Sequence, residues 1–167
     1  IKFSHKVHAG QNKIDCKYCH SIATQSKSAG FPSANLCMNC HKVVVAGTRS
    51  GKFEIKKIYR AVESGKPIEW VRVHKLPDHA FFSHAQHVSA GQVQCQTCHG
   101  PVETMDLIKQ VSDLSMGWCV NCHRQTEIKA TTNKYYESFK AIQDDAKAGK
   151  KITAERLGGI DCAKCHY

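Results

Sequence analysis

Cys95-Gln96-Thr97-Cys98-His99 separates two cysteines by two residues and places a histidine directly after the second. This pattern is typical of a c-type haem attachment site, because two thiols one helical turn apart can bond one porphyrin and the next side chain then reaches the iron. The pattern recurs four more times, at Cys16-Cys19-His20, Cys37-Cys40-His41, Cys119-Cys122-His123 and Cys162-Cys165-His166. The copies use all ten cysteines. We therefore predict five haems c, with thioether bonds at all ten cysteines and proximal iron ligands at His20, His41, His99, His123 and His166.

Two other uses of paired cysteines explain the pattern less well. A zinc ribbon needs two such pairs around one metal, and five pairs cannot be divided in that way. A disulfide framework gives no reason for a histidine after every pair, and cysteines at this spacing rarely bridge each other.

Composition agrees with a chain that wraps cofactors. Hydrophobic residues make up 41% of the 167 positions, so haem faces are expected to supply much of the interior. The formal charge of +10 at pH 7 would favour nucleic acid, but the haem propionates offset most of it and no aromatic residues interleave with a basic patch. We expect no nucleic-acid partner. The fold class expected is a multihaem cytochrome c, mostly irregular, with a few short α-helices and minimal strand.

The cellular location follows from the cofactor. Covalent haem attachment takes place outside the cytoplasm, so we expect the folded chain in the periplasm. The chain starts at Ile1 without Met, so we expect that a signal peptide or membrane anchor was removed, or that a longer subunit exists. No run of about 20 apolar residues lies within the sequence.

An internal repeat organises the chain. Phe3-Ser4-His5-Lys6-Val7-His8 lies eight residues before the first motif, and Phe82-Ser83-His84-Ala85-Gln86-His87 lies eight residues before the third. We divide the single domain, residues 1–167, into a first dihaem unit (1–48), a connector (49–79), a second dihaem unit (80–124) and a final segment with a helix and the fifth haem (125–167). Apolar spacing predicts helices over 52–63 and from about 136 to 148, and a strand-like stretch over 68–73. A last short turn, capped by Thr153, is expected before Gly158.

Six histidines remain once the proximal ligands are assigned, and five irons need a second ligand. His5, His8, His84 and His87 are expected to serve four of them, because the spaced pair occurs twice at a constant distance before a motif. His74 is preferred for the fifth, with Met116 and His79 as alternatives. Imidazole on both sides of the iron makes a low-spin haem that moves electrons without an open position for a substrate.

The spaced histidine pair resembles that of class III bis-histidine multihaem cytochromes, in which the first histidine usually serves the nearest haem and the second a different one. A resemblance over nearly the whole chain is to the pentahaem cytochrome c subunit of alternative complex III. The residues that carry it are residues 3–10, 37–41, 70–78 and 116–123. This resemblance implies electron transfer in the respiratory chain, on the periplasmic side of a bacterial membrane-bound quinol oxidising complex. It also implies an iron–sulfur subunit, a second cytochrome c and, often, a terminal oxidase as partners.

Two classes of function are compatible with these motifs. The preferred one is an electron-carrier subunit with no catalytic residues and no small-molecule substrate of its own. The alternative is a redox partner or enzyme of a nitrogen or sulfur oxyanion oxidoreductase. An enzyme needs an iron with an open position, and the supply of histidines disfavours one.

Overall fold

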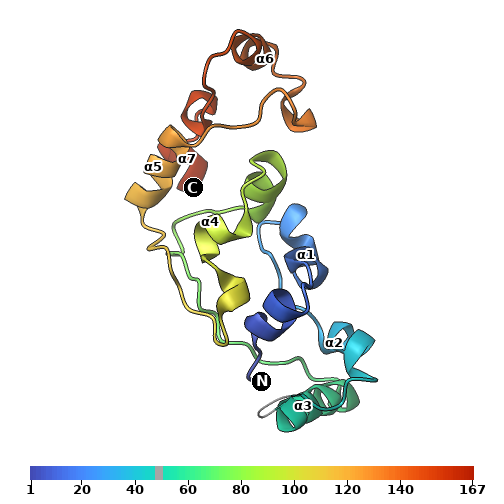
Figure 1. The fold of residues 1–167 in the computed structure, drawn as a ribbon. Coiled ribbons are helices and arrows are strands. Elements are labelled where there is room, and N and C mark those ends of the chain that lie inside the picture. Colours follow the sequence, from blue (N-terminus) through green and yellow to red (C-terminus); the bar gives the residue numbers. More distant parts are fainter. Residues whose placement is uncertain (48–50) are drawn as a thin grey trace. The chain divides into compact units, whose positions relative to one another are not determined.

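The structure is a computed structural model that describes residues 1–47 and 51–167. Within these ranges the chain forms short helices joined by irregular segments (Figure 1). The α-helices are α1 (Cys16–Cys19), α2 (Ala34–His41), α3 (Gly51–Ser64), α4 (Cys95–His99), α5 (Met116–Gln125), α6 (Lys140–Lys147) and α7 (Cys162–Cys165). Two π-helices span Lys6–Gln11 and Gln86–Ala90, and 3₁₀ turns span Ser21–Thr24, Val102–Thr104, Lys134–Tyr136 and Ala154–Leu157. This architecture confirms the expected fold class.

Regular strands are absent from the described residues. The stretch over 68–73 has the alternation of a strand but no strand forms there, because no neighbouring segment pairs with its backbone. The β-type pairing described is an isolated antiparallel bridge between Glu127 and Thr153. None of the described helices is long and apolar enough to span a membrane.

The described residues divide into two compact units, each built from three separate segments. Unit 1 contains Ile1–Ser21, Gly30–His74 and Pro101–Gln110, and unit 2 contains Ile22–Ala29, Lys75–Gly100 and Val111–Tyr167. The division expected from the repeat runs in chain order, whereas these units exchange the short segments that follow the first and third motifs. The expected boundary between residues 48 and 49 lies outside the described residues.

The exchanged segments pack against the histidine pairs of the repeat. We call Phe3–His8 lead 1 and Phe82–His87 lead 2. In unit 1, the backbone N–H of Lys6 in lead 1 donates to the carbonyl of Met105 at 2.9 Å. In unit 2, the backbone N–H of Ala85 in lead 2 donates to the carbonyl of Ser26 at 3.0 Å. Each lead is thus held by the segment that follows a motif of the other repeat, so one repeat alone does not supply a complete unit.

Gly10 allows the closest approach between lead 1 and its exchanged segment. A Cβ atom built on Gly10 would collide with the backbone carbonyl of Glu103, which belongs to the turn Val102–Thr104. We expect Gly10→Ala to lower the free energy of unfolding by about 1–3 kcal/mol, because backbone atoms must move to admit the methyl group. Chemical denaturation of the haem-loaded protein measures this difference.

A matched control for this substitution is Gly51→Ala at the start of α3. No described atom outside the local backbone lies within 4 Å of a Cβ built on Gly51, and alanine favours the helix. The control is expected to leave stability unchanged or slightly higher. Equal losses in the two variants would contradict the close approach at Gly10.

Side-chain caps begin the motif helices α1, α2 and α5. The Ser33 hydroxyl accepts from the backbone N–H of Leu36 at 3.3 Å, and the Ser115 hydroxyl accepts from that of Trp118 at 3.2 Å. Each serine lies four residues before the first cysteine of its motif, so the two caps are equivalent in the repeat. The Asp15 carboxylate caps α1 through the N–H of Lys17 at 2.7 Å. These caps stabilise the starts of the helices that carry the first, second and fourth motifs.

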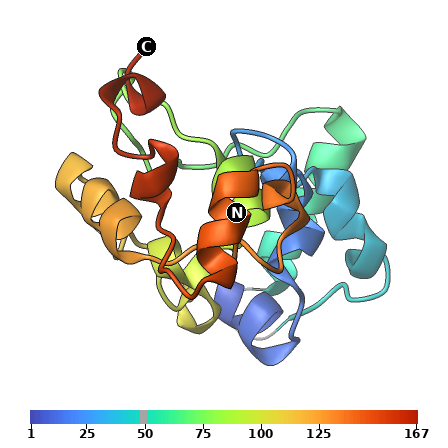
Figure 2. The same ribbon diagram turned by 90° about the horizontal axis from the view of Figure 1, so that it is seen from above.

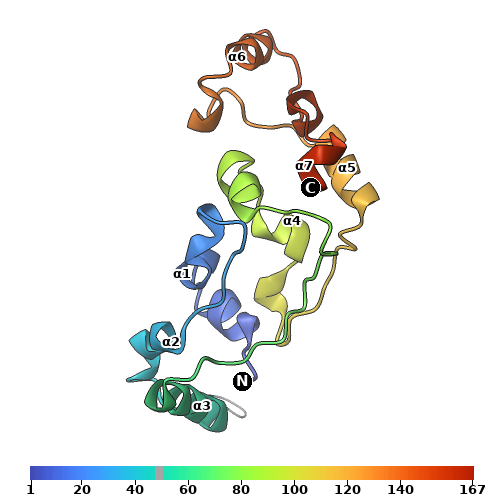
Figure 3. The same cartoon turned by 180° about the vertical axis from the view of Figure 1, so that it is seen from behind.

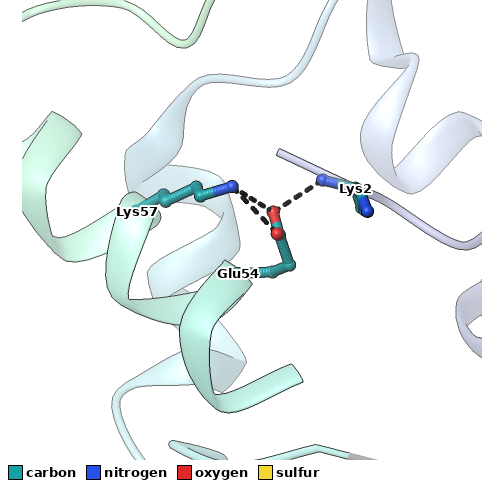
Figure 4. Close-up of polar contacts among 3 residues, drawn as sticks. All are labelled: Lys2, Glu54 and Lys57. Carbon is teal, nitrogen blue, oxygen red and sulfur yellow. Dashed lines mark hydrogen bonds and ion pairs between the residues drawn. The ribbon is translucent and has the colours of Figure 1, made fainter. Parts of the chain in front are cut away.

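Helix α3 confirms the prediction over 52–63 and packs beside α2 (Figure 1, Figure 3). Ile55 and Ile58 are its buried residues, and the Tyr59 hydroxyl donates to the carbonyl of His41 at 2.5 Å. The Glu54 carboxylate accepts from the Lys57 ammonium at 2.8 Å and from the backbone N–H of Lys2 at 2.8 Å (Figure 4). The helix therefore braces both the second motif and the N-terminal residues.

The segment after the fourth motif forms a small apolar cluster of its own. Its buried members are Ile128, Ala130, Tyr136 and Ile152, with Ile142, Ala146 and Leu157 packed against them. The Asn133 side chain is also buried and donates to the carbonyl of Ala90 at 2.7 Å, which ties this cluster to the π-helix Gln86–Ala90 at the end of lead 2. The turn Ala154–Leu157 lies beside α5 (Figure 2). The cluster thus anchors the elements that surround the fourth and fifth motifs.

The helix predicted from about residue 136 is shorter than expected. A 3₁₀ turn covers Lys134–Tyr136 and α6 begins only at Lys140, because Phe139 has a non-helical backbone conformation. The predicted end at Gly149 is confirmed by a positive φ of 78°. The predicted last turn exists as Ala154–Leu157, but the Thr153 side chain makes no cap bond to it.

Candidate haem sites

Each of the five motifs begins a short helix or lies within one. Their helices are α1, α2, α4, α5 and α7, so the two thiols of each motif lie about one helical turn apart. All ten cysteines are free of disulfides. Among residues 1–47 and 51–167, no three side chains of His, Cys, Asp or Glu gather closely enough to hold a metal ion. Each motif thus presents its two thiols on its own helix.

The proximal histidines are oriented by backbone carbonyls. Nδ1 bonds to a carbonyl oxygen in each of these proximal histidines: His20 to Gly30 at 2.8 Å, His41 to Val44 at 2.7 Å, His123 to Gly159 at 2.5 Å and His166 to His79 at 3.0 Å. A carbonyl only accepts, so Nδ1 must carry the proton and Nε2 keeps its lone pair for a metal. This is the usual second-shell arrangement of a metal-binding imidazole.

Three proximal rings face a second imidazole at the separation that an iron between them requires. Two metal–nitrogen bonds of roughly 2 Å, with roughly 1 Å from each nitrogen to its ring centre, give roughly 6 Å between ring centres. The ring centres are 6.1 Å apart for His8 and His41, 6.3 Å for His84 and His99, and 5.9 Å for His87 and His123. The residues present at these three sites therefore fit a haem iron with two axial histidines.

The facing histidines of the leads are also held through Nδ1. His8 bonds to the carbonyl of Ser4 at 2.9 Å, and His87 bonds to that of Ser83 at 2.8 Å. His84 bonds to the carbonyl of Lys27 at 2.9 Å. Burial, the largest cause, lowers the pKa of His87, so its imidazole is neutral at pH 7 and can donate its lone pair.

His5 lies close to the proximal histidine of the first motif. Burial, and then the nearby His20 and His8, together lower the pKa of His5 to about 4. The ring is therefore uncharged at neutral pH, as a metal ligand must be. The structure thus places all four lead histidines near motif histidines of their own unit.

A π-helical turn follows the first histidine of each lead. The N–H of Asn12 donates to the carbonyl of Val7 at 3.1 Å in lead 1, and that of Gly91 donates to the carbonyl of Gln86 at 2.8 Å after lead 2. Across the histidine pairs themselves the backbone bonds are four-residue ones, from the N–H of His8 to the carbonyl of Ser4 at 3.3 Å and from that of His87 to Ser83 at 3.4 Å. The two histidines of each lead lie beside two different motif histidines.

The fifth motif has a different neighbour. The rings of His79 and His166 are 5.6 Å apart, but Nδ1 of His166 bonds to the carbonyl oxygen of His79. The ring of His79 must lie within roughly 6 Å of its own carbonyl oxygen, which is bonded to His166. A ring on the far side of an iron held by His166 would lie roughly 10 Å from that oxygen. His79 therefore lies on the proximal side, where it orients His166.

The other alternative for the fifth distal ligand is also disfavoured. Met116 is 71% exposed at the start of α5, the same helix that carries Cys119, Cys122 and His123. His74 is half-buried, and burial lowers its pKa, so its imidazole is neutral at pH 7. The geometry thus disfavours both alternatives to His74.

Residues 84–167, about half of the chain, match the sequence profile of the cytochrome c3 family. The chain belongs to the cytochrome c3 family. It is an electron-transferring multihaem cytochrome whose c-type haems are covalently bound. This family membership agrees with the paired imidazoles, whose separation fits an iron held between them.

A relative of this cytochrome c3 family member is the multihaem cytochrome c subunit of menaquinone reductase from Nitratidesulfovibrio vulgaris Hildenborough. The two sequences are 39% identical over 99 residues, which cover 59% of this chain and 44% of the relative. The matched stretch thus spans less than half of the relative's length.

Motif cysteines of this cytochrome gather within each unit. Burial and then the neighbouring Cys37 and Cys40 raise the pKa of Cys19 in unit 1. Burial and then Cys122 and Cys119 raise the pKa of Cys98 in unit 2. Such coupling requires short distances, so the first and second motifs are neighbours in unit 1, as are the third and fourth in unit 2.

The fourth and fifth motifs are neighbours as well. Burial and then Cys165 raise the pKa of Cys119, and the Arg124 guanidinium pairs with the Glu155 carboxylate at 3.5 Å. The carbonyl of Gly159, three residues before Cys162, accepts from the Nδ1 of His123. Unit 2 therefore has the attachment cysteines of three motifs in the order third, fourth, fifth.

Sequence reasoning did not identify the groups that orient the imidazoles. Gly30, Val44, Gly159 and Lys27 act through backbone carbonyls, which every residue possesses, so no residue type marks them. His79 is expected from the sequence as an alternative distal ligand, whereas in the structure its backbone carbonyl orients His166.

Proposed function

We propose that this chain is a five-haem electron wire on the periplasmic side of a membrane-bound complex that exchanges electrons with a quinone pool. The observation that supports this proposal is the set of three imidazole pairs about 6 Å apart, because each pair would hold an iron from both sides and leave it no position for a substrate. When bound, haem c supplies one-electron iron chemistry. The chain's own residues attach it, orient its ligands and set its surroundings.

We assign the ligands site by site on this basis. The proposed proximal and distal pairs are His20 with His5, His41 with His8, His99 with His84 and His123 with His87. His74 is proposed as the fifth distal ligand because His79 lies on the proximal side of its motif, Met116 is exposed, and His74 is a neutral, half-buried imidazole.

The direction of electron flow has two candidates. The sequence resemblance to alternative complex III favours quinol oxidation, with electrons leaving through the cytochrome towards a second cytochrome c or a terminal oxidase. The relative from Nitratidesulfovibrio vulgaris is named for menaquinone reduction, which favours the opposite direction. Both require an adjoining subunit that exchanges electrons between these haems and the quinone site, and an iron–sulfur subunit is the proposed neighbour.

A tagged copy of the chain, purified from membranes of its native host, tests this function. We expect it to co-purify with an iron–sulfur subunit and a membrane subunit. Adding menaquinol to the oxidised complex should reduce its haems if quinol oxidation is the direction. Adding menaquinone to the reduced complex should oxidise them if quinone reduction is the direction. The haem absorption bands report both reactions.

Two outcomes would contradict the proposal. One is a chain that purifies as a monomer and exchanges no electrons with either quinone form in the membrane fraction. The other is direct turnover of nitrite or a sulfur oxyanion by the purified chain, which would favour the alternative reading as part of a nitrogen or sulfur oxyanion oxidoreductase. Added reduced viologen with each of these anions provides that assay.

A further inference from the structure

The two leads form a matched pair with the same local aromatic packing. The ring of Phe3 lies edge-on to His5 at 4.8 Å and stacks on His8 at 4.3 Å. Phe82 lies edge-on to His84 at 4.9 Å and stacks on His87 at 4.4 Å. The first histidine of each lead therefore has the same aromatic neighbour, and a difference between His5 and His84 must come from elsewhere.

Hydrogen bonding supplies such a difference. The carbonyl of Lys27 accepts from both the backbone N–H of His84, at 3.1 Å, and its Nδ1, at 2.9 Å. In the part of the chain that the structure describes, Nδ1 of His5 is buried and has no hydrogen-bond partner. The exchanged segment reaches lead 1 at Lys6, through the carbonyl of Met105, but supplies no acceptor to the His5 ring.

A buried polar atom without a partner is uncommon in proteins, and a redox role is one established reason for retaining it. When the Nδ1–H of a metal-bound imidazole donates to a carbonyl, the ring becomes a stronger electron donor through Nε2. Stronger donation stabilises the ferric state, which carries one more positive charge than the ferrous state, and so lowers the reduction potential. Without that bond the imidazole donates less.

We propose that the first haem site, at Cys16 and Cys19, has a higher reduction potential than its repeat equivalent at Cys95 and Cys98, because among the described residues Nδ1 of His5 lacks the hydrogen bond that Nδ1 of His84 makes. Reduction at either site adds one electron to the iron and breaks no bond. The inference rests on the proposed five-haem function and on His5 and His84 as distal ligands. The backbone of the exchanged segments would then control the reduction potential, which the sequences of the two motifs do not indicate.

The test compares the two sites within one haem-loaded protein. The variants His5→Met and His84→Met identify which low-spin electron paramagnetic resonance signal of the wild type belongs to each site, because each variant alters its own signal. A potentiometric titration of the wild type then gives the midpoint of each assigned signal. We expect the site served by His5 to be reduced at the higher potential, by about 59 mV for a tenfold difference in the one-electron equilibrium constant.

A second measurement does not depend on either variant being assembled. In the fully reduced, diamagnetic wild type, proton nuclear magnetic resonance should show the Nδ1–H of His84 at lower field than that of His5, because hydrogen bonding deshields the proton. Equal shifts would mean that another group holds the His5 ring in the loaded protein, and would overturn the inference. Equal or reversed midpoints would overturn it too.

Failure of the inference and failure of the proposed function give different results. If each variant alters one signal but the midpoints are equal or reversed, the five-haem wire stands and the role of His5 falls. If neither variant alters any low-spin signal, the ligand assignment falls, and both proposals fall with it.

Discussion

Replacing His87 with alanine is expected to convert one low-spin haem into a high-spin haem that binds CO. The ring of His87 faces that of His123 at 5.9 Å, and its Nδ1 is held by the Ser83 carbonyl at 2.8 Å. Removing the imidazole opens one axial position of the iron while the thioether bonds keep the haem attached. Optical titration of the reduced protein with CO measures the fraction of haem that responds, which should rise from none to one haem per chain.

The matched control is His79→Ala, in which another histidine close to a motif histidine is truncated. Its contribution to the fifth site is the backbone carbonyl, which the substitution retains, so all haems should stay low-spin and silent to CO. His74→Ala should behave like His87→Ala. If His79→Ala binds CO and His74→Ala does not, the assignment of the fifth distal ligand is wrong.

Replacing both Cys162 and Cys165 with alanine is expected to reduce the covalent haem content from five per chain to four. This motif lies outside the twofold repeat, so the repeat gives no separate argument that a haem is attached there. The pyridine haemochrome assay on denatured protein counts covalent haem directly. We expect the wild type to give five, because every motif contains two thiols and a histidine.

The corresponding control removes a motif inside the repeat, Cys95 and Cys98, and should also give four haems. Two results would contradict the count. A wild-type value of four that the Cys162 and Cys165 substitution does not change would mean that the last motif binds no haem. A loss of more than one haem in that variant would show that haem attachment at another motif depends on the fifth site. The fourth motif is the candidate for such a dependence, because its Cys119 lies near Cys165.

The amino-acid sequence by itself determined the covalent chemistry of this protein. A c-type attachment site requires only residues adjacent along the chain, such as Cys95, Cys98 and His99, so local sequence contains all the necessary information. Local pattern was also sufficient for α3, whose apolar positions recur at helical spacing, and for the end of α6 at Gly149. The family membership confirmed the resulting fold class.

Only the tertiary structure decided which imidazoles face each other and what orients them. Ring pairs such as His87 and His123 join residues far apart in sequence, and spacing along the chain does not specify such pairs. His79 illustrates the limit, because its sequence context suits a ligand and only the bond from His166 to its carbonyl places it on the proximal side. The exchange of short segments between the two repeats has the same origin. Backbone carbonyls, which are present in every residue, hold His84 and leave His5 without a partner among the described residues, so the difference depends on tertiary packing and not on residue type.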